Sequence, residues 1–315
     1  MSATGGSAAA EPSRIKIYLA FAAIYIIWGS TYFFIREALD GFPPFMLGGL
    51  RFLVAALLMF AWCMATGVSI KPGRDLMTAA ITGFLLCFVG NGAVVWVEQI
   101  IPSSVVAIAI AVAPLSFIVL DKPNWRVNFR SLSTLFGVIA GFVGVLLLFS
   151  EKIAAQLGSA EVTPEFSALF ILLLAVIGWP AGSLYAKYNP AAIPNVVHSG
   201  WQMFTGAGCF LAVSAGRGEW STMNWNTVPL GAWGALAYLI VFGSIIGFSA
   251  YVWLLQMRPA TQVSTYAYVN PVVAVLLGVF VGSESLGWRE IAGLIVILGG
   301  VLLINLARYR SSKSN

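Results

Sequence analysis

The sequence predicts an all-α polytopic membrane protein with ten transmembrane helices, arranged as two inverted repeats of five helices with cytoplasmic N- and C-termini. The first of three observations behind this prediction is the composition: 59% of the 315 residues are hydrophobic, 9% are charged, and the mean hydropathy is +0.89. Soluble chains carry about 25% charged residues. This chain cannot cover a globular surface with polar groups, so its solvent must be lipid. The other observations are the spacing of apolar blocks and an internal repeat.

Apolar blocks recur along nearly the whole chain, and a spanning helix needs roughly 20 mostly apolar residues. Polar, Pro-containing or Gly-containing segments separate the blocks. The first block is too long for a signal peptide and further spans follow it, so we expect it to be retained. The expected spans are residues 17–36, 43–66, 76–98, 103–120, 131–149, 166–188, 194–214, 230–255, 261–282 and 289–307.

The ends of the chain and its Lys and Arg residues predict the orientation. Residues 1–13 are rich in Ala, Gly and Ser and are expected to form a disordered tail, whereas residues 308–315 form a basic cytoplasmic tail. With the N-terminus inside, the inner segments hold twelve of the 17 Lys and Arg residues, the outer segments hold four, and Arg51 lies within a span. Cytoplasmic loops carry such an excess. The basic pI of about 9.2 therefore indicates membrane flanks rather than nucleic-acid binding.

An internal repeat relates the two halves, residues 14–152 and 153–307. Residues 90–102 recur at 247–259 at one constant offset of 157, so that tryptophan, glutamine and proline coincide, and the same offset carries Pro114 onto Pro271. Because each half holds five spans, the second half must enter the membrane with the opposite orientation. Two such halves can exchange conformations around one central site. Transport by alternating access is therefore the natural interpretation of the repeat.

Four stretches together resemble the drug/metabolite transporter superfamily, in its ten-span EamA-type branch. They are IIWGSTY at 26–32, residues 44–52, residues 266–278 with Glu284, and the glycine-rich tenth span. The resemblance covers roughly residues 15–307. It implies an inner-membrane carrier, commonly an exporter of amino acids or related metabolites, and aromatic-amino-acid exporters are among the nearest-looking members. Asp121 in the first half does not match the position of Glu284, so the role of Glu284 is not carried over to it.

The substrate site is expected near the bilayer midplane, between the halves and beside interrupted helices. Proline removes one helical hydrogen bond and frees the carbonyl four residues earlier. Pro114 and Pro271 would free the carbonyls of Ile110 and Ala267. We interpret both prolines as gating hinges, with packed structural kinks as the alternative.

Aromatic and polar side chains on shared helix faces are the candidates for substrate binding. Aromatic walls with a few amides and hydroxyls suit a zwitterionic or amphipathic ligand, and cation–π contact suits an ammonium group. Packing or interfacial placement is the alternative for each residue. The candidates are Trp28, Tyr32, Asn91, Glu98, Trp179, Ser183, Tyr266, Tyr268 and Asn270.

Few ionisable residues lie within the predicted spans. Glu98 could couple protons or bind a substrate amine, or it could be a solvated carboxylate at the outer end of its span. Arg51 could bind a carboxylate, although snorkelling or a structural pair is favoured. The repeat places Leu255 opposite Glu98 and Gln202 opposite Arg51, so both break the internal symmetry. His198, the sole histidine, is expected to be an interfacial polar residue.

The sequence thus predicts a secondary active transporter that exports amino acids, aromatic or broadly neutral, or related small metabolites. The alternatives are an intramembrane enzyme, which would need clustered acids with a metal or a nucleophile with a base, and a channel-like facilitator. The three cysteines form no CxxC pair, and no metal site or cofactor is expected. The expected partners are a small-molecule substrate and the lipid bilayer, without nucleic acid, and the expected state is a monomer or weak homodimer.

Overall fold

The computed structural model describes residues 14–129, 132–157 and 162–313, and helices joined by turns make up these segments. The tail predicted at residues 1–13 lies outside the described residues. Of the predicted basic tail, residues 308–313 continue the last helix, and residues 314–315 lie outside the described part.

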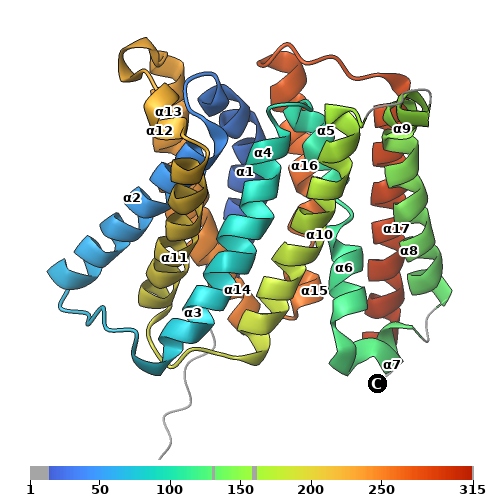
Figure 1. The fold of residues 1–315 in the computed structure, drawn as a ribbon. Helices are drawn as coiled ribbons and strands as arrows, with labels where there is room; N and C mark the ends of the chain where they lie inside the picture. The colour runs from blue at the N-terminus through green and yellow to red at the C-terminus, as the bar shows by residue number, and fades with distance from the viewer. Residues whose placement is uncertain (1–13, 130–131, 158–161, 314–315) are drawn as a thin grey trace, which may run out of the picture.

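Most helices run up and down between two faces of the molecule, and short helices and turns connect them (Figure 1). They are α1 (Arg14–Leu39), α2 (Pro44–Ala65), α3 (Leu76–Thr82), α4 (Gly92–Val97), α5 (Ser103–Ile110), α6 (Ala113–Leu120), α7 (Trp125–Asn128), α8 (Leu132–Leu148), α9 (Ser150–Leu157), α10 (Pro164–Tyr188), α11 (Asn195–Gly216), α12 (Glu219–Thr222), α13 (Leu230–Tyr238), α14 (Ser249–Met257), α15 (Ala260–Val263), α16 (Tyr266–Phe280) and α17 (Trp288–Lys313). Two π-helical segments, η2 (Gly83–Asn91) and η5 (Leu239–Phe248), join α3 to α4 and α13 to α14.

The helices have the length and surface of membrane-spanning elements. Within the described residues, six helical stretches are long and apolar enough to cross a bilayer, and two shorter apolar helices accompany them. Large apolar side chains face outward, including Trp62, Phe142 and Ile295, which are 66%, 61% and 65% exposed. These features are those of a polytopic membrane protein, because soluble monomers rarely expose so much contiguous apolar surface to water. The count of ten spans, the inversion and the side of the termini stay predictions.

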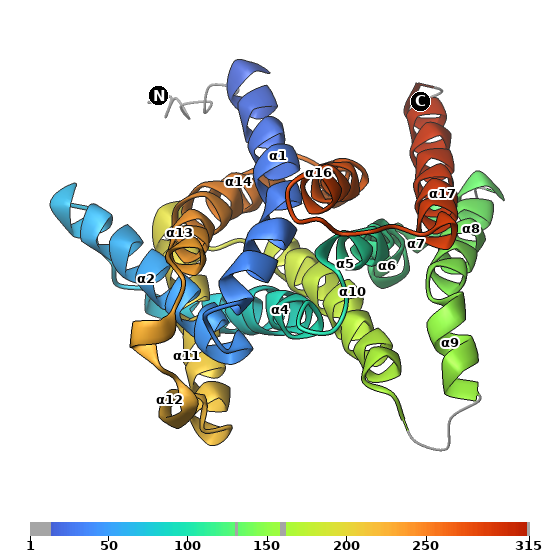
Figure 2. The ribbon, with the colours of Figure 1, turned by 90° about the horizontal axis from the view of Figure 1, so that it is seen from above.

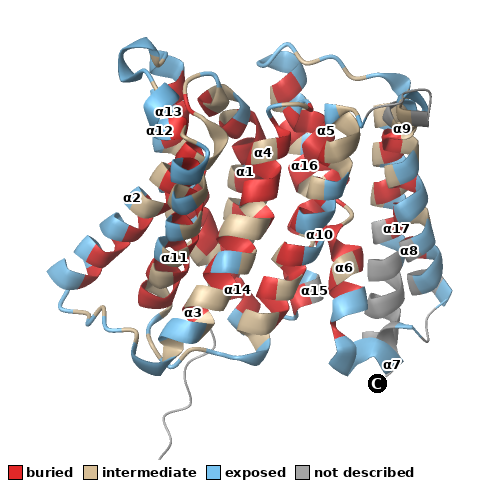
Figure 3. Ribbon diagram, in the orientation of Figure 1, coloured by how far each residue is buried: buried red, intermediate tan, exposed pale blue. Residues whose placement is uncertain are grey.

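α4 and α5 bury most of their residues, whereas α8 carries many exposed ones (Figure 3). α1 packs against α16 on one side and against α13, η5 and α14 on another. α10 packs correspondingly against α5 and α6 and against α3, η2 and α4. Seen from above, α2 with α11 and α8 with α17 form pairs at opposite sides of this centre (Figure 2).

Glycines allow α8 and α17 to approach at backbone distance. A Cβ atom at Gly300 would lie 2.7 Å from the carbonyl oxygen of Gly137, and one at Gly144 would lie 3.0 Å from the backbone nitrogen of Ile297. Small residues permit such close packing where lipid supplies no hydrophobic drive between helices. The pair therefore depends on the absence of side chains at these positions.

Two of the apolar helical stretches, residues 103–120 and 260–280, are each interrupted. α5 ends at Ile110 and α6 begins at Ala113, directly before Pro114, as the missing amide of proline predicts. Pro271, in contrast, lies inside the continuous helix α16, and the interruption falls earlier, at residues 264–265. The hydroxyl of Thr265 donates to the Gln262 carbonyl at 2.7 Å and also bonds the hydroxyl of Tyr25. These bonds stabilise the turn at residues 264–265. The break therefore lies nearer the start of this helical stretch than the break expected at Pro271.

Candidate functional site

A central cavity lies where α1, α2, α10, α16 and both π-helical segments meet. Its volume is about 70 Å³, well above the roughly 10–15 Å³ that a cavity needs to hold one water. That space suits a small polar group held against ring faces. The lining residues are Trp28, Thr31, Tyr32, Ile35, Arg51, Phe52, Gly90, Asn91, Val94, Ile110, Ala113, Ala175, Trp179, Gly243, Phe248, Tyr266 and Asn270.

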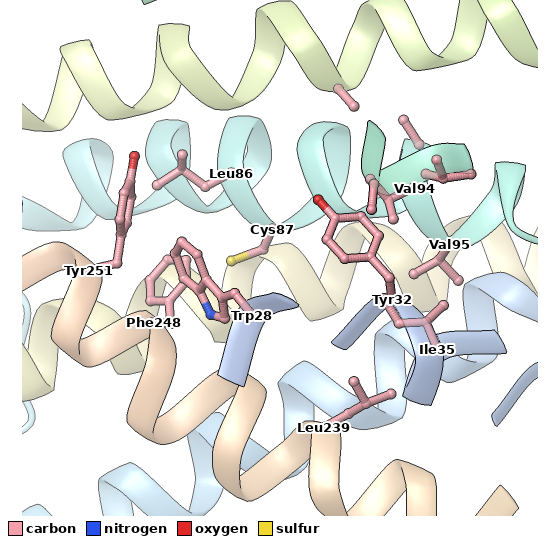
Figure 4. Close-up of a cluster of buried hydrophobic side chains, with 14 of the residues drawn as sticks. Trp28, Tyr32, Ile35, Leu86, Cys87, Val94, Val95, Leu239, Phe248 and Tyr251 are labelled. Carbon is pink, nitrogen blue, oxygen red and sulfur yellow. The ribbon is translucent and has the colours of Figure 1, made fainter. Parts of the chain in front are cut away.

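Four rings from four helices form an aromatic cluster at one end of this cavity: Trp28, Trp179, Tyr251 and Tyr266. The Trp28 ring centroid lies 5.3 Å from that of Trp179, 4.8 Å from that of Tyr251 and 5.3 Å from that of Tyr266. The pairs of Trp28 with Trp179 and with Tyr266 are edge-to-face, an arrangement that is favourable because ring edges and faces carry opposite partial charges. Figure 4 shows Trp28 and Tyr251 beside Phe248, with Tyr32 farther along α1.

Hydrogen bonds fix the rings of this cluster. Tyr251 accepts from Trp179 Nε1 at 3.0 Å, and its hydroxyl lies 2.5 Å from Ser183 Oγ. Ser183 donates its own proton to the Trp179 carbonyl at 2.7 Å, so Tyr251 must be the donor to Ser183. Trp28 Nε1 donates to the Gly243 carbonyl at 3.1 Å. The indole N–H groups of Trp28 and Trp179 and the hydroxyl of Tyr251 thus each have a partner, which holds these three rings in one arrangement.

Arg51 provides the charge of the cavity and is only 4% exposed. Its Nε donates to Ser244 Oγ at 2.8 Å, its Nη1 donates to Asn91 Oδ1 at 3.4 Å, and its guanidinium stands 4.9 Å from the centroid of the Phe52 ring. The side chain therefore points inward with neutral partners. It does not snorkel outward, because these polar partners and the cavity lie on the inner face of α2.

Asn270 is the second amide of the cavity. With its amide nitrogen turned toward the backbone of α1 and α16, it donates to the carbonyls of Tyr25 and Tyr266, each at 3.0 Å. Because Tyr25 belongs to α1 and Tyr266 to α16, these two bonds connect α16 to α1. Its position beside Pro271 places the proline next to the lining rather than in it.

Six of the nine predicted binding residues line the cavity, and the other three do not. Ser183 is fully buried behind the aromatic cluster, where it supports Tyr251. Tyr268 is half-buried and packs against the apolar core. Glu98 lies at the end of α4, beyond the lining. The six that line it are Trp28, Tyr32, Asn91, Trp179, Tyr266 and Asn270.

Glu98 is fully buried, so its interpretation as a solvated carboxylate is wrong. Among the described residues, neither of its carboxylate oxygens has a hydrogen-bond partner. Its backbone carbonyl accepts from Arg36 Nη1 at 2.6 Å, and Arg36, Arg51 and Glu284 are the charged groups that act on it. His198 is also buried rather than interfacial, at 3% exposure. Tertiary packing covers both residues, which periodicity along one helix does not report.

Glu284, in the loop after α16, caps the first turn of α5. One carboxylate oxygen accepts from Ser103 N at 2.9 Å and from Ser103 Oγ at 2.7 Å, and the other accepts from Ser104 N at 3.1 Å and from Ser104 Oγ. Partial burial opposes ionisation, but these four bonds outweigh it and lower the pKa of Glu284 below its usual value. An ionised carboxylate therefore ties this loop to the helix whose other end reaches the cavity.

Among the residues that sequence reasoning missed are two polar ones that support the cavity wall from outside its lining, Tyr251 and Ser244. Tyr251 stands at the position that the repeat equates with Val94, so a polar ring replaces an aliphatic side chain there. That asymmetry is the signal by which it could have been found. Ser244 offers no comparable signal, because a single hydroxyl in an apolar span is common. Among the described residues, no three His, Cys, Asp or Glu side chains gather where they could hold a metal ion.

The family model described as EamA-like transporter family matches residues 15–150 and 166–306. The chain is 36% identical over 298 residues to the uncharacterized inner membrane transporter YedA of Escherichia coli strain K12, covering 94% of this chain and 92% of the relative. It is 23% identical to protein PecM of Dickeya dadantii, covering 88% of each. One solved crystal structure shares its fold, with a TM-score of 0.65 and 18% identity, over 94% of this chain and 100% of that one.

Proposed function

The chain belongs to the EamA-like transporter family and is a multi-pass inner-membrane transporter, and from this premise we propose that it exports amino acids or related small metabolites as a secondary carrier. The observation that carries the proposal is the central cavity, which combines an aromatic wall with two amides and one cation. Such a lining suits a small molecule that has an apolar body and charged ends.

Alternating access is the mechanism that we propose, and the packing of the helices supports it. The contacts of α1 with α16 and with α13 to α14 have counterparts in those of α10 with α5 to α6 and with α3 to α4. The π-helical segments η2 and η5 also fall at equivalent positions of the repeat, within one residue. Matched contacts of this kind are expected when two related halves surround one site and can exchange their conformations.

Equivalent hydrogen bonds at the ends of α4 and α14 give further support to alternating access. Arg36 donates to the carbonyl of Glu98, and Lys187 donates to the carbonyls of Leu255 and Arg258 at 3.2 Å and 2.9 Å. Glu98 and Leu255 are counterparts at the repeat offset of 157. In the first half, a cation at the end of α1 thus bonds a carbonyl at the end of α4, and in the second half a cation at the end of α10 bonds carbonyls at the end of α14. Release of one such cap and closure of the other would be one way to open alternate faces.

Counterflow in proteoliposomes tests the proposal. Vesicles loaded with an unlabelled amino acid should accumulate the same labelled amino acid in a saturable manner for at least one member of a panel of the twenty common amino acids. Trp28→Ala should abolish this accumulation, because it removes the centre of the aromatic cluster. Trp62→Ala, at a lipid-facing position that is 66% exposed, is the matched control and should retain it. Absence of counterflow across the whole panel would refute the amino-acid substrate, and unsaturable flux would favour the channel instead.

A further inference from the structure

Arg51 is a buried charge without a counter-charge. Removing a cation from water is costly unless an anion and further hydrogen bonds compensate it. In the described part of the chain, the ion pair formed is that of Arg289 with Glu151 at the surface, and no carboxylate lies within ion-pair distance of Arg51. Glu98 acts on Arg51 electrostatically from farther away and does not line the cavity. The charge therefore faces a cavity with no anion in its wall.

The guanidinium also has donors to spare. It carries five N–H groups, of which the described residues accept two: one bonds Ser244 at 2.8 Å and one bonds Asn91 at 3.4 Å. The second of these is longer than an ordinary N–H···O bond. The donors left over belong to Nη1 and Nη2, the edge that can present two parallel N–H groups to a carboxylate.

A glycine leaves space at this edge. A Cβ atom at Gly243 would lie 3.0 Å from Arg51 Nη2 and 3.0 Å from Thr31 Cγ2, so any larger residue would press on the guanidinium. The carbonyl of the same Gly243 accepts from Trp28 Nε1. One residue thus joins the charged wall to the aromatic cluster and fixes their relative position.

We propose that Arg51 binds the carboxylate of the transported molecule, which makes the substrate a small monocarboxylic acid whose remainder contacts the aromatic cluster. This inference rests on the proposed function, since it takes the cavity to be the place where the transported molecule binds. A single cation balances a single negative charge. A phosphate or a dicarboxylate would leave a net negative charge in a cavity that offers no second cation among the described residues.

The test compares acids with their own amides by ligand-induced thermal stabilisation of the full-length protein in detergent. The probes are phenylalanine, phenylalaninamide, phenethylamine and hydrocinnamate, followed by the other common amino acids and their amides. For the wild type, we expect at least one acid to raise the unfolding temperature, with an apparent affinity about 10- to 100-fold above that of its amide, because hydrogen bonds to a charged group are lost. Equal affinity of acid and amide, or binding by none of the acids, would overturn the inference.

Variants then assign the preference to one side chain. Arg51→Gln should bind acid and amide equally, and Arg51→Lys should keep part of the preference, because it retains the charge without the planar fork. The control is Arg217→Gln, the same change at an exposed arginine, and it should behave as wild type. An unchanged preference in Arg51→Gln would contradict the assignment. Should that variant fail to fold, the comparison of acids with their amides on the wild type still tests whether the cavity prefers a carboxylate.

The two proposals fail in different ways. Counterflow without any preference for the carboxylate would leave the transport function standing and remove the role of Arg51. Carboxylate-selective binding that depends on Arg51, without counterflow, would support the binding site and refute the export of that acid.

Discussion

The cap that Glu284 places on α5 predicts a measurable stability effect. In Glu284→Gln, the amide oxygen can still accept bonds from one serine, but the amide nitrogen cannot accept those of the other. One backbone N–H, that of Ser103 or that of Ser104, which now donate at 2.9 Å and 3.1 Å, therefore loses its acceptor. The negative charge at the first turn of α5 is lost as well, although that position favours an anion.

The size of the effect follows from these two losses. Hydrogen bonds to a charged group contribute about 1.5–3 kcal/mol, and an anion at a helix N-terminus contributes about 0.3–1 kcal/mol. Glu284 is half-buried, so solvent weakens both contributions. We therefore expect Glu284→Gln to lower the free energy of unfolding by about 2 kcal/mol at pH 7.

The effect should depend on pH with a defined sign. The pKa of Glu284 is lower in the folded protein than in the unfolded chain, where a glutamate side chain has a pKa of about 4.3. The carboxylate thus stabilises the fold above that value, and this contribution is lost as the pH falls through the lowered pKa. The difference between wild type and Glu284→Gln should shrink accordingly as the pH is lowered.

Chemical unfolding in mixed micelles, followed by circular dichroism between pH 7 and pH 3, measures both quantities. Glu151→Gln is the control, since Glu151 forms an exposed ion pair with Arg289 and should cost no more than about 1 kcal/mol. A Glu284→Gln protein as stable as wild type at pH 7 would refute the reasoning. So would a stability difference of constant size across the titration.

Two further variants test the packing. Gly300→Leu should destabilise the protein by about 1–3 kcal/mol, because α17 meets the α8 backbone there, whereas Gly299→Leu, with open space around it, should be nearly neutral in the same unfolding assay. Tyr251→Phe should cost about 1–2 kcal/mol, because the Trp179 N–H loses its acceptor and the Ser183 hydroxyl loses one of its two bonds. It should also slow counterflow, and equal rates and equal unfolding midpoints would count against a role for the cluster.

The residues of the site show how far sequence reasoning reaches. Trp28, Tyr32 and Asn270 could be selected because aromatic and polar side chains share faces of their helices, a pattern that suits a binding site. Tyr268, two residues from Asn270, satisfied the same criterion and lies outside the lining. Adjacent faces of one helix differ only in what packs against them, and that is a property of other segments.

Arg51 and Glu98 illustrate the same limit for charges. A charge near the end of a span can reach the interface, pair with a neighbour or face the interior, and hydropathy does not distinguish these cases. In the structure, Arg51 turns toward Ser244, which is 193 residues away in sequence, and Glu98 is sealed by neighbouring elements. Both outcomes depend on long-range neighbours.

By itself, the sequence determined the membrane class, the all-helical architecture and the family, because lipid imposes long apolar blocks and internal hydrogen bonding on any chain that crosses it. The break before Pro114 was likewise local, since proline lacks the amide that the helix needs. Only the tertiary structure decided that six candidate residues converge on one cavity, that Tyr251 completes the aromatic cluster and that the second break precedes Pro271. Those features arise from contacts between distant helices, and their energies appear only when the faces of those helices meet.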